Sequence, residues 1–178
     1  MNRQKTAANV TPDSAVRVLI VDDHQMVREG IKLMLSPYDD IAVVGEADTA
    51  AAGLSAFESL QPDVTLLDLQ LPDRSGLDVL QELQSRDDTS KVLVLTVHDD
   101  DDLVLAAVRA GARGYMLKHT SHEELARAIR AIARGDHFFG PDVVGALIQG
   151  EVRSHQPALT DREHDVLKLL VGGLTNRD

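Results

Sequence analysis

Five polar residues each follow a short apolar run, and together they could carry out phosphoryl chemistry. They are Asp22 and Asp23 after VRVLIV, Asp68 after VTLL, Thr96 after KVLVL, and Lys118 after GYML. If those runs are parallel strands, all five side chains lie along one edge of one sheet, where open α/β sheets bind their ligands. Three carboxylates, a hydroxyl and a lysine at one edge suit a divalent cation and a phosphoryl group.

The chemistry of these side chains favours metal-assisted phosphoryl transfer to a carboxylate. The three carboxylates would repel one another unless a cation neutralised them. Mg²⁺ fits, because it prefers one or two carboxylates together with water and phosphate oxygens. An aspartate can also act as a nucleophile and form an acyl phosphate. Asp68 is the predicted acceptor because it stands alone, whereas the neighbours Asp22 and Asp23 can share one ion. Thr96 and Lys118 would supply a hydroxyl donor and a positive charge.

The elements that position these residues follow from an alternation of strand and helix signals. Most predicted strands are near-continuous apolar runs, as in strands buried on both faces. The predicted strands are Val16–Val21, Ile41–Ala47, Val64–Leu67, Lys91–Leu95 and Gly114–Leu117. The predicted helices are Gln25–Leu35, Thr49–Leu60, Gly76–Ser85, Asp101–Ala110 and Ser121–Arg134. This order indicates an α/β fold with a doubly wound, five-stranded parallel sheet.

The chain divides into four predicted segments. Residues 1–15 are polar and mixed, so we expect a disordered leader there and no secretory signal. Residues 16–134 form the predicted α/β domain, and residues 135–158, which begin with GDHFFGPD, form a linker. Residues 159–178 open a further helix, in which Thr160 and Glu163 form a capping box. We interpret this tail as the incomplete start of an all-α domain.

Composition excludes several classes of function. The net charge is −11, which disfavours nucleic-acid binding by this chain because phosphate backbones bind Lys and Arg. The absence of cysteine excludes disulfides, thiol nucleophiles and thiolate metal sites. No apolar run is long enough to span a bilayer, so we expect no membrane partner and a cytoplasmic localisation.

The stretch from about Val16 to Arg134 resembles the receiver domain of bacterial two-component response regulators. VLIVDDH, LLDLQLPDRSGLD, VLVLTVH and GYMLK occur in it in this order. The resemblance implies a flavodoxin-like fold, in which a sensor histidine kinase donates a phosphoryl group to Asp68 with Mg²⁺ as cofactor. Such a regulator is no enzyme in the usual sense, because it catalyses only its own phosphorylation and dephosphorylation.

The resemblance also implies roles for individual residues. Asp23 and Asp68 would bind Mg²⁺ directly, together with the backbone carbonyl of Gln70, and Asp22 would act mainly through water.

The resemblance also implies that Thr96 and Tyr115 act as a switch. Thr96 and Lys118 would contact the phosphoryl oxygens, and Tyr115 would be the aromatic residue that swings inward on activation.

A second resemblance lies in the tail. LTDREHDVLKLLVGGLTNRD resembles the opening of the LuxR-type helix-turn-helix domain of NarL/FixJ-type regulators. The match covers the first helix and the start of the next, so the recognition helix is absent. Residues 151–178 hold four Lys or Arg against five Asp or Glu, and we assign no DNA-binding residue within this chain. DNA would be a partner only through the complete C-terminal domain, and the family also implies a homodimer.

Two other functions stay open. A Mg²⁺-dependent phosphatase of the haloacid-dehalogenase type would carry DxDx[TV] on its first strand, and VDDHQ does not match that pattern. A stand-alone receiver would act as an adaptor through protein binding alone. That interpretation gains support if the chain ends at Asp178 in the cell, and a longer open reading frame would weaken it.

The histidines near the acidic residues have simpler interpretations. His98 and Asp99–Asp102 form an HDDDD cluster, which we interpret as a helix N-terminus that favours negative charge rather than as a second metal site. His24 follows the acidic pair and is expected to line the pocket.

Overall fold

The residues that the structure describes are arranged around one parallel sheet. The structure is a computed structural model, and it describes residues 15–87, 89–97, 100–140 and 143. The strands within those ranges are β1 (Val16–Val21), β2 (Ile41–Ala47), β3 (Val64–Leu67), β4 (Val92–Thr96), β5 (Gly114–Leu117) and β6 (Phe138–Phe139). Their order is β2-β1-β3-β4-β5-β6, and each neighbouring pair is parallel.

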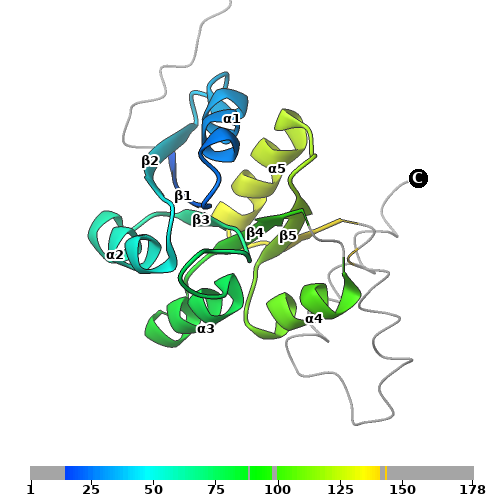
Figure 1. Ribbon diagram of the computed structural model, residues 1–178. Helices are drawn as coiled ribbons and strands as arrows, with labels where there is room; N and C mark the ends of the chain where they lie inside the picture. The colour runs from blue at the N-terminus through cyan, green and yellow to red at the C-terminus, as the bar shows by residue number, and fades with distance from the viewer. Residues whose placement is uncertain (1–14, 88, 98–99, 141–142, 144–178) are drawn as a thin grey trace, which may run out of the picture.

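Helices cover both faces of this sheet. Those in the described ranges are α1 (Gln25–Leu35), α2 (Ala50–Leu60), α3 (Gly76–Arg86), α4 (Asp101–Arg109) and α5 (His122–Ala133). Helices α1 and α5 lie on one face, and α2, α3 and α4 lie on the other (Figure 1). The predicted α/β fold with a doubly wound parallel sheet is therefore confirmed.

The hydrophobic core follows the alternation of side chains along each strand. In β1, Leu19 and Val21 belong to the cluster shared with α2, α3 and α4, whereas Val18 and Ile20 belong to the cluster shared with α1 and α5. All four side chains are buried. Successive residues of a strand point to opposite faces, so a continuous apolar run fills two cores at once. Each such side chain stabilises the fold by about 2 kcal/mol.

The predicted element boundaries agree with the structure to within one residue. Thr49 and Ser121 lie just before α2 and α5 because they are N-caps, whose hydroxyls accept hydrogen bonds from backbone N–H groups three residues on, at 3.2 Å in both cases. Strand β4 begins and ends one residue later than predicted, so Thr96 is its last residue. Helix α3 ends one residue later and α4 one residue earlier than predicted.

Strand β6 was not predicted, so the count of five strands was wrong. The segment GDHFFGPD was interpreted as a turn or linker, yet Phe138 and Phe139 pair with Gly114 and Tyr115 of β5. The Phe138 N–H donates to the carbonyl of Arg113 at 2.9 Å. Two residues are too few to show a strand periodicity in the sequence, so only the pairing with β5 reveals this strand.

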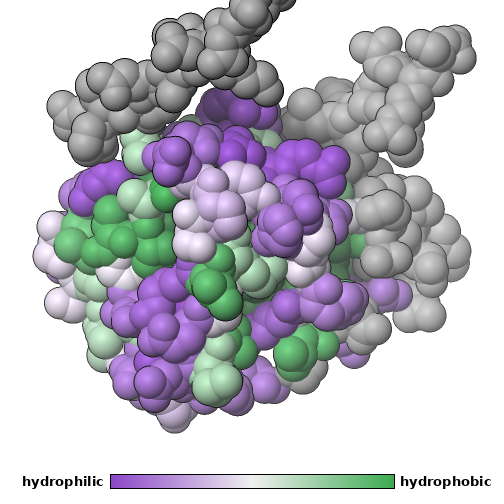
Figure 2. All heavy atoms as spheres, turned by 90° about the horizontal axis from the view of Figure 1, so that it is seen from above, coloured by the Kyte–Doolittle hydropathy of each residue, from purple (hydrophilic) through white to green (hydrophobic). Residues whose placement is uncertain are grey.

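Several expectations fall outside the described residues. These include residues 1–14 of the leader and the helix expected to open in residues 159–178, so the division of the chain into four segments stays a prediction. None of the helices in the described part of the chain is long and apolar enough to cross a membrane. On the side of α1 and α5, hydrophilic residues cover most of the described surface and hydrophobic residues show as separate patches (Figure 2). Met26 and Leu33 of α1 are exposed hydrophobic residues.

Candidate functional site

Neighbouring strands bring the predicted polar residues to one edge of the sheet. Asp22 follows β1, Asp68 follows β3, Thr96 ends β4 and Lys118 follows β5, and these strands lie side by side in that order. The Asp68 N–H donates to the carbonyl of Val21 at 2.9 Å, and the Lys118 N–H donates to the carbonyl of Thr96 at 2.8 Å. The structure thus places these four residues together at the carboxyl ends of the strands, as the sequence predicts.

Lys118 forms a bridge between two buried carboxylates. Its Nζ lies 2.6 Å from Oδ2 of Asp22 and 2.6 Å from Oδ2 of Asp68. The side chains of Asp22, Asp68 and Lys118 are 3%, 4% and 10% exposed. Such short contacts between ions are the strong form of hydrogen bond. One ammonium group therefore holds two carboxylates that would otherwise repel each other.

The environment keeps Lys118 positively charged. Burial is the largest single influence on its pKa and by itself lowers it, because an ion loses solvation in the protein interior. The hydrogen bonds and charges of Asp22 and Asp68 act in the opposite direction, and together they raise the pKa above the ordinary value of 10.5. The charged ammonium is therefore a fixed component of this edge at neutral pH.

Asp23 and His24 complete the cluster on its open side. The side chain of Asp23 is 34% exposed, in contrast to its neighbour Asp22. Nδ1 of His24 lies 2.6 Å from Oδ1 of Asp23, and the backbone N–H of His24 donates to Oδ1 of Asp22 at 2.9 Å. His24 was expected only to line the pocket, and it contacts both members of the acidic pair.

The donor set fits a hard divalent cation. One ligand atom each from Asp22, Asp23, His24 and Asp68 all lie within 4.8 Å of one another. Three carboxylates against the ammonium group of Lys118 leave an excess of negative charge, which a cation with oxygen ligands would neutralise. Both carboxylate oxygens of Asp22 already have partners, whereas Asp23 is more accessible. This arrangement favours Asp23 over Asp22 as a direct ligand.

The loop after β3 orients Asp68. The backbone N–H of Gln70 donates to Oδ1 of Asp68 at 3.3 Å, and an antiparallel bridge between Gln70 and Ser75 closes the loop. The Gly76 N–H donates to the carbonyl of Leu69 at 2.8 Å. A Cβ atom on Gly76 would collide with the backbone of Asp68 and Leu69, so this closed loop needs glycine there.

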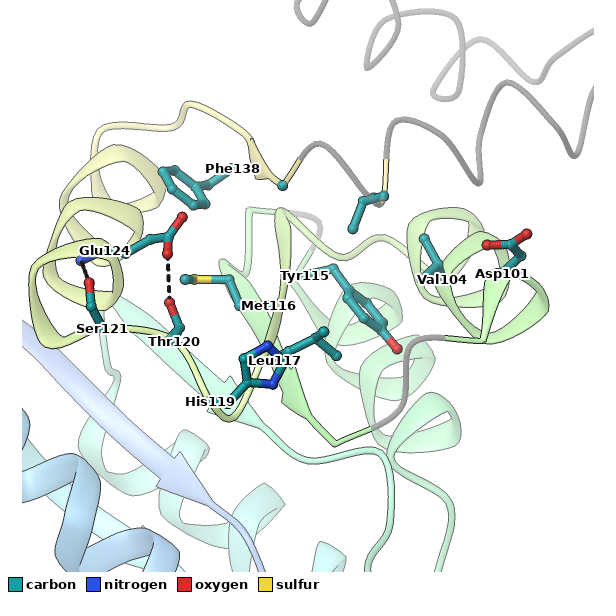
Figure 3. Close-up of a pocket in the computed structure, with 12 residues that line it drawn as sticks. Asp101, Val104, Tyr115, Met116, Leu117, His119, Thr120, Ser121, Glu124 and Phe138 are labelled. Atoms are coloured by element: carbon teal, nitrogen blue, oxygen red, sulfur yellow. Dashed lines mark hydrogen bonds between the residues drawn. The ribbon is translucent and has the colours of Figure 1, made fainter.

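Tyr115 lies at a groove between α4, β5 and α5. The groove has a volume of about 430 Å³, and the ring of Tyr115 lies between Leu117 and Val104 of α4 (Figure 3). Tyr115 is 2% exposed and Thr96 is fully buried. The ring therefore occupies an inward position in this structure, and its movement on activation stays a prediction.

The HDDDD cluster is in part a helix cap, as expected. Asp100 is the N-cap of α4, and its carboxylate accepts hydrogen bonds from the N–H groups of Asp102 at 2.9 Å and Leu103 at 3.3 Å. His98 and Asp99 lie outside the described residues.

Two residues that the sequence did not single out also support the site. The guanidinium of Arg28 in α1 donates to the backbone carbonyl of Asp22 at 2.7 Å. The carboxylate of Asp73, in the loop after β3, accepts hydrogen bonds from the N-terminus of α2. The contact of Asp73 joins segments more than twenty residues apart, whereas that of Arg28 spans six residues, and no pattern in the sequence signals either of them.

Comparisons with known proteins agree over most of the chain. Residues 18–130 match the family described as the response regulator receiver domain. The transcriptional regulatory protein YdfI of Bacillus subtilis is 36% identical over 166 residues, which cover 90% of this chain and 78% of that protein. The nitrate/nitrite response regulator protein NarL of Escherichia coli K12 is 35% identical over 167 residues, covering 90% and 77%. The crystal structure of a LuxR-family two-component response regulator from Aurantimonas sp. SI85-9A1 matches with a TM-score of 0.73 at 32% identity, covering 79% of this chain and 100% of that chain.

Proposed function

Because the chain belongs to the response regulator receiver family and is a two-component regulator of transcription like its NarL and LuxR relatives, we propose that Asp68 accepts the phosphoryl group. The observation that carries this proposal is the position of Asp68. It is a buried carboxylate at the carboxyl end of a central strand, held by the ammonium of Lys118 within a cluster of acidic side chains.

The proposed reaction is an in-line transfer from a phosphohistidine of a sensor histidine kinase. A carboxylate oxygen of Asp68 attacks phosphorus, the O–P bond forms as the N–P bond breaks, and the imidazole leaves with the electron pair of that bond. The N–H of Gln70 and the Nζ of Lys118 orient the two oxygens of Asp68 beforehand. Lys118 and the hydroxyl of Thr96 then stabilise the charge on the phosphoryl oxygens.

Magnesium would be held by the acidic side of the same edge. Receiver domains use Mg²⁺ at an acidic pocket, and the cluster of Asp22, Asp23 and Asp68 has the right chemistry for it. Asp23, Asp68 and the carbonyl of Gln70 are the proposed direct ligands, and Asp22 would act through water. When bound, the ion neutralises the charge between the carboxylates and the incoming phosphoryl group.

The proposed output is a shift between two existing conformations. A phosphoryl group on Asp68 would give Lys118 and Thr96 new partners, and this change would bias the equilibrium. Tyr115, buried beside α4, would pass the change to the surface of α4, β5 and α5, or helices α1 and α5 would carry it.

Residues 16–134 are the proposed receiver in this scheme. The segment that begins near residue 159, which resembles the start of a LuxR-type helix-turn-helix domain, would belong to the part of the regulator that contacts DNA, and homodimerisation stays a prediction.

Intact mass after incubation with acetyl phosphate tests the assignment. The wild-type chain should gain one phosphoryl group only when Mg²⁺ is present, and Asp68→Asn should gain none. Asp40→Asn, which changes a carboxylate at the opposite end of the sheet, is the matched control and should react like the wild type. An adduct that persists in Asp68→Asn would show that the acceptor is another residue.

A further inference from the structure

Asp73 fastens the loop that carries the proposed acceptor to a different helix. This residue lies five positions after Asp68, in the part of the loop that the bridge between Gln70 and Ser75 encloses. Its Oδ1 accepts a hydrogen bond from the N–H of Ala50 at 2.8 Å, and its Oδ2 accepts one from the N–H of Ala51 at 3.0 Å. Both N–H groups are at the start of α2, so each oxygen of the carboxylate has its own donor.

Asp73 and Thr49 together cap α2. The first N–H groups of a helix have no partner within the helix. The first hydrogen bond within α2 runs from Gly53 to the carbonyl of Thr49 at 2.9 Å, and the hydroxyl of Thr49 accepts from Ala52 at 3.2 Å. Asp73 accepts from the two N–H groups before these, and these backbone hydrogen bonds, with that of Ala50 foremost, lower its pKa. A negative charge is also favoured at a helix N-terminus.

The hydrogen bonds from Ala50 and Ala51 to Asp73 restrain the loop whose geometry matters for metal binding. The bridge between Gln70 and Ser75 closes the near end of the loop, and Asp73 holds the far end. Gln70 supplies both the N–H that orients Asp68 and the carbonyl proposed to bind Mg²⁺. Helix α2 follows β2, whose last carbonyl, that of Ala47, accepts from the N–H of Asp22. The contact between Asp73 and α2 therefore connects the loop after Asp68, through α2 and β2, to the segment that carries Asp22 and Asp23.

We propose that Asp73 is a positioning residue, which holds the Gln70 carbonyl and the Asp68 carboxylate in the geometry that binds Mg²⁺ and accepts the phosphoryl group. The inference rests on the proposed function of Asp68. It assigns to Asp73 an effect on metal binding that a simple helix cap would not have, because supporting hydrogen bonds around a metal site commonly set its affinity.

The chain offers a matched control for this effect. Thr49→Ala also removes a side-chain cap of α2, but Thr49 is not part of the loop after β3. Both Asp73→Ala and Thr49→Ala should lower the urea midpoint by similar amounts. Asp73→Ala should weaken Mg²⁺ binding about tenfold, whereas Thr49→Ala should leave it within about twofold of the wild type. Asp73→Asn keeps one acceptor oxygen and should give an intermediate affinity.

Two readouts separate this inference from the proposed function. The Mg²⁺ affinity is measured by a titration of backbone amide NMR signals of the unphosphorylated chain, which needs no phosphorylation. The second readout is the Mg²⁺ concentration that gives half the maximal rate of reaction with acetyl phosphate. Equal affinities in Asp73→Ala and Thr49→Ala would overturn the positioning role. A wild-type chain that binds Mg²⁺ but gains no phosphoryl group would overturn the proposed function instead.

Discussion

Two clusters of cations and carboxylates lie at opposite ends of the sheet and differ in charge balance. At the carboxyl ends of the strands, Lys118 bridges Asp22 and Asp68, and all three side chains are at most 10% exposed. At the amino end of β2, Arg130 of α5 donates two hydrogen bonds to Asp40, at 2.6 and 2.8 Å, and these side chains are 34% and 42% exposed. The first cluster has an excess of carboxylates, whereas the second pairs one cation with one anion.

The difference separates a site built for chemistry from a contact built for structure. A balanced, half-exposed pair joins α5 to the start of β2 and changes stability only a little. Buried carboxylates in excess destabilise the protein unless a further cation binds, and proteins accept that loss where function requires it. The charge that makes the first cluster unfavourable is the same charge that attracts Mg²⁺.

The largest effect is expected when Lys118 is removed. Lys118→Met would leave Asp22 and Asp68 buried without their shared cation, and breaking such a pair costs about 3 kcal/mol of unfolding free energy. Mg²⁺ should restore part of this loss, because it can neutralise the same carboxylates. Arg130→Met is the matched control at the other cluster. It should lose less, and Mg²⁺ should stabilise it only as much as it stabilises the wild type. Urea unfolding with and without Mg²⁺ measures both. Equal losses in the two variants would remove the contrast between the clusters.

A smaller, pH-dependent effect is expected at Asp40. The hydrogen bonds from Arg130 hold the pKa of Asp40 below its ordinary value of 3.8. Because its pKa is lowered in the folded state, Asp40 stabilises the protein at pH values above its ordinary pKa. This stabilisation is lost as the pH falls through the lowered pKa. Asp40→Asn should therefore cost about 0.5 kcal/mol at neutral pH.

The difference between this variant and the wild type should disappear in acid. Urea midpoints of the two proteins, measured at neutral pH and well below the pKa of Asp40, give the comparison. A difference that stays constant with pH would assign the effect of Asp40→Asn to packing instead of charge.

The polar edge could be predicted from the sequence because it depends on local signals. Apolar runs mark the strands, and parallel strands place the residues that follow them, such as Asp22, Asp68 and Lys118, at one edge. Contacts between segments that are distant in the chain have no such local signal. The contact of Asp73 with α2 depends on how segments distant in the chain pack. Strand β6 was missed for the same reason, because it exists only through its pairing with β5.

The most direct test of the contrast is the response of folding stability to Mg²⁺. Thermal unfolding is followed for the wild type, Asp23→Asn and Asp40→Asn as Mg²⁺ is added. A ligand that binds only the folded state raises its stability in a saturable way. We expect such a rise for the wild type and Asp40→Asn and a much smaller one for Asp23→Asn. The latter variant should already be more stable than the wild type without the ion, because one like charge is gone. A rise of equal size in all three proteins, or none in the wild type, would contradict this expectation.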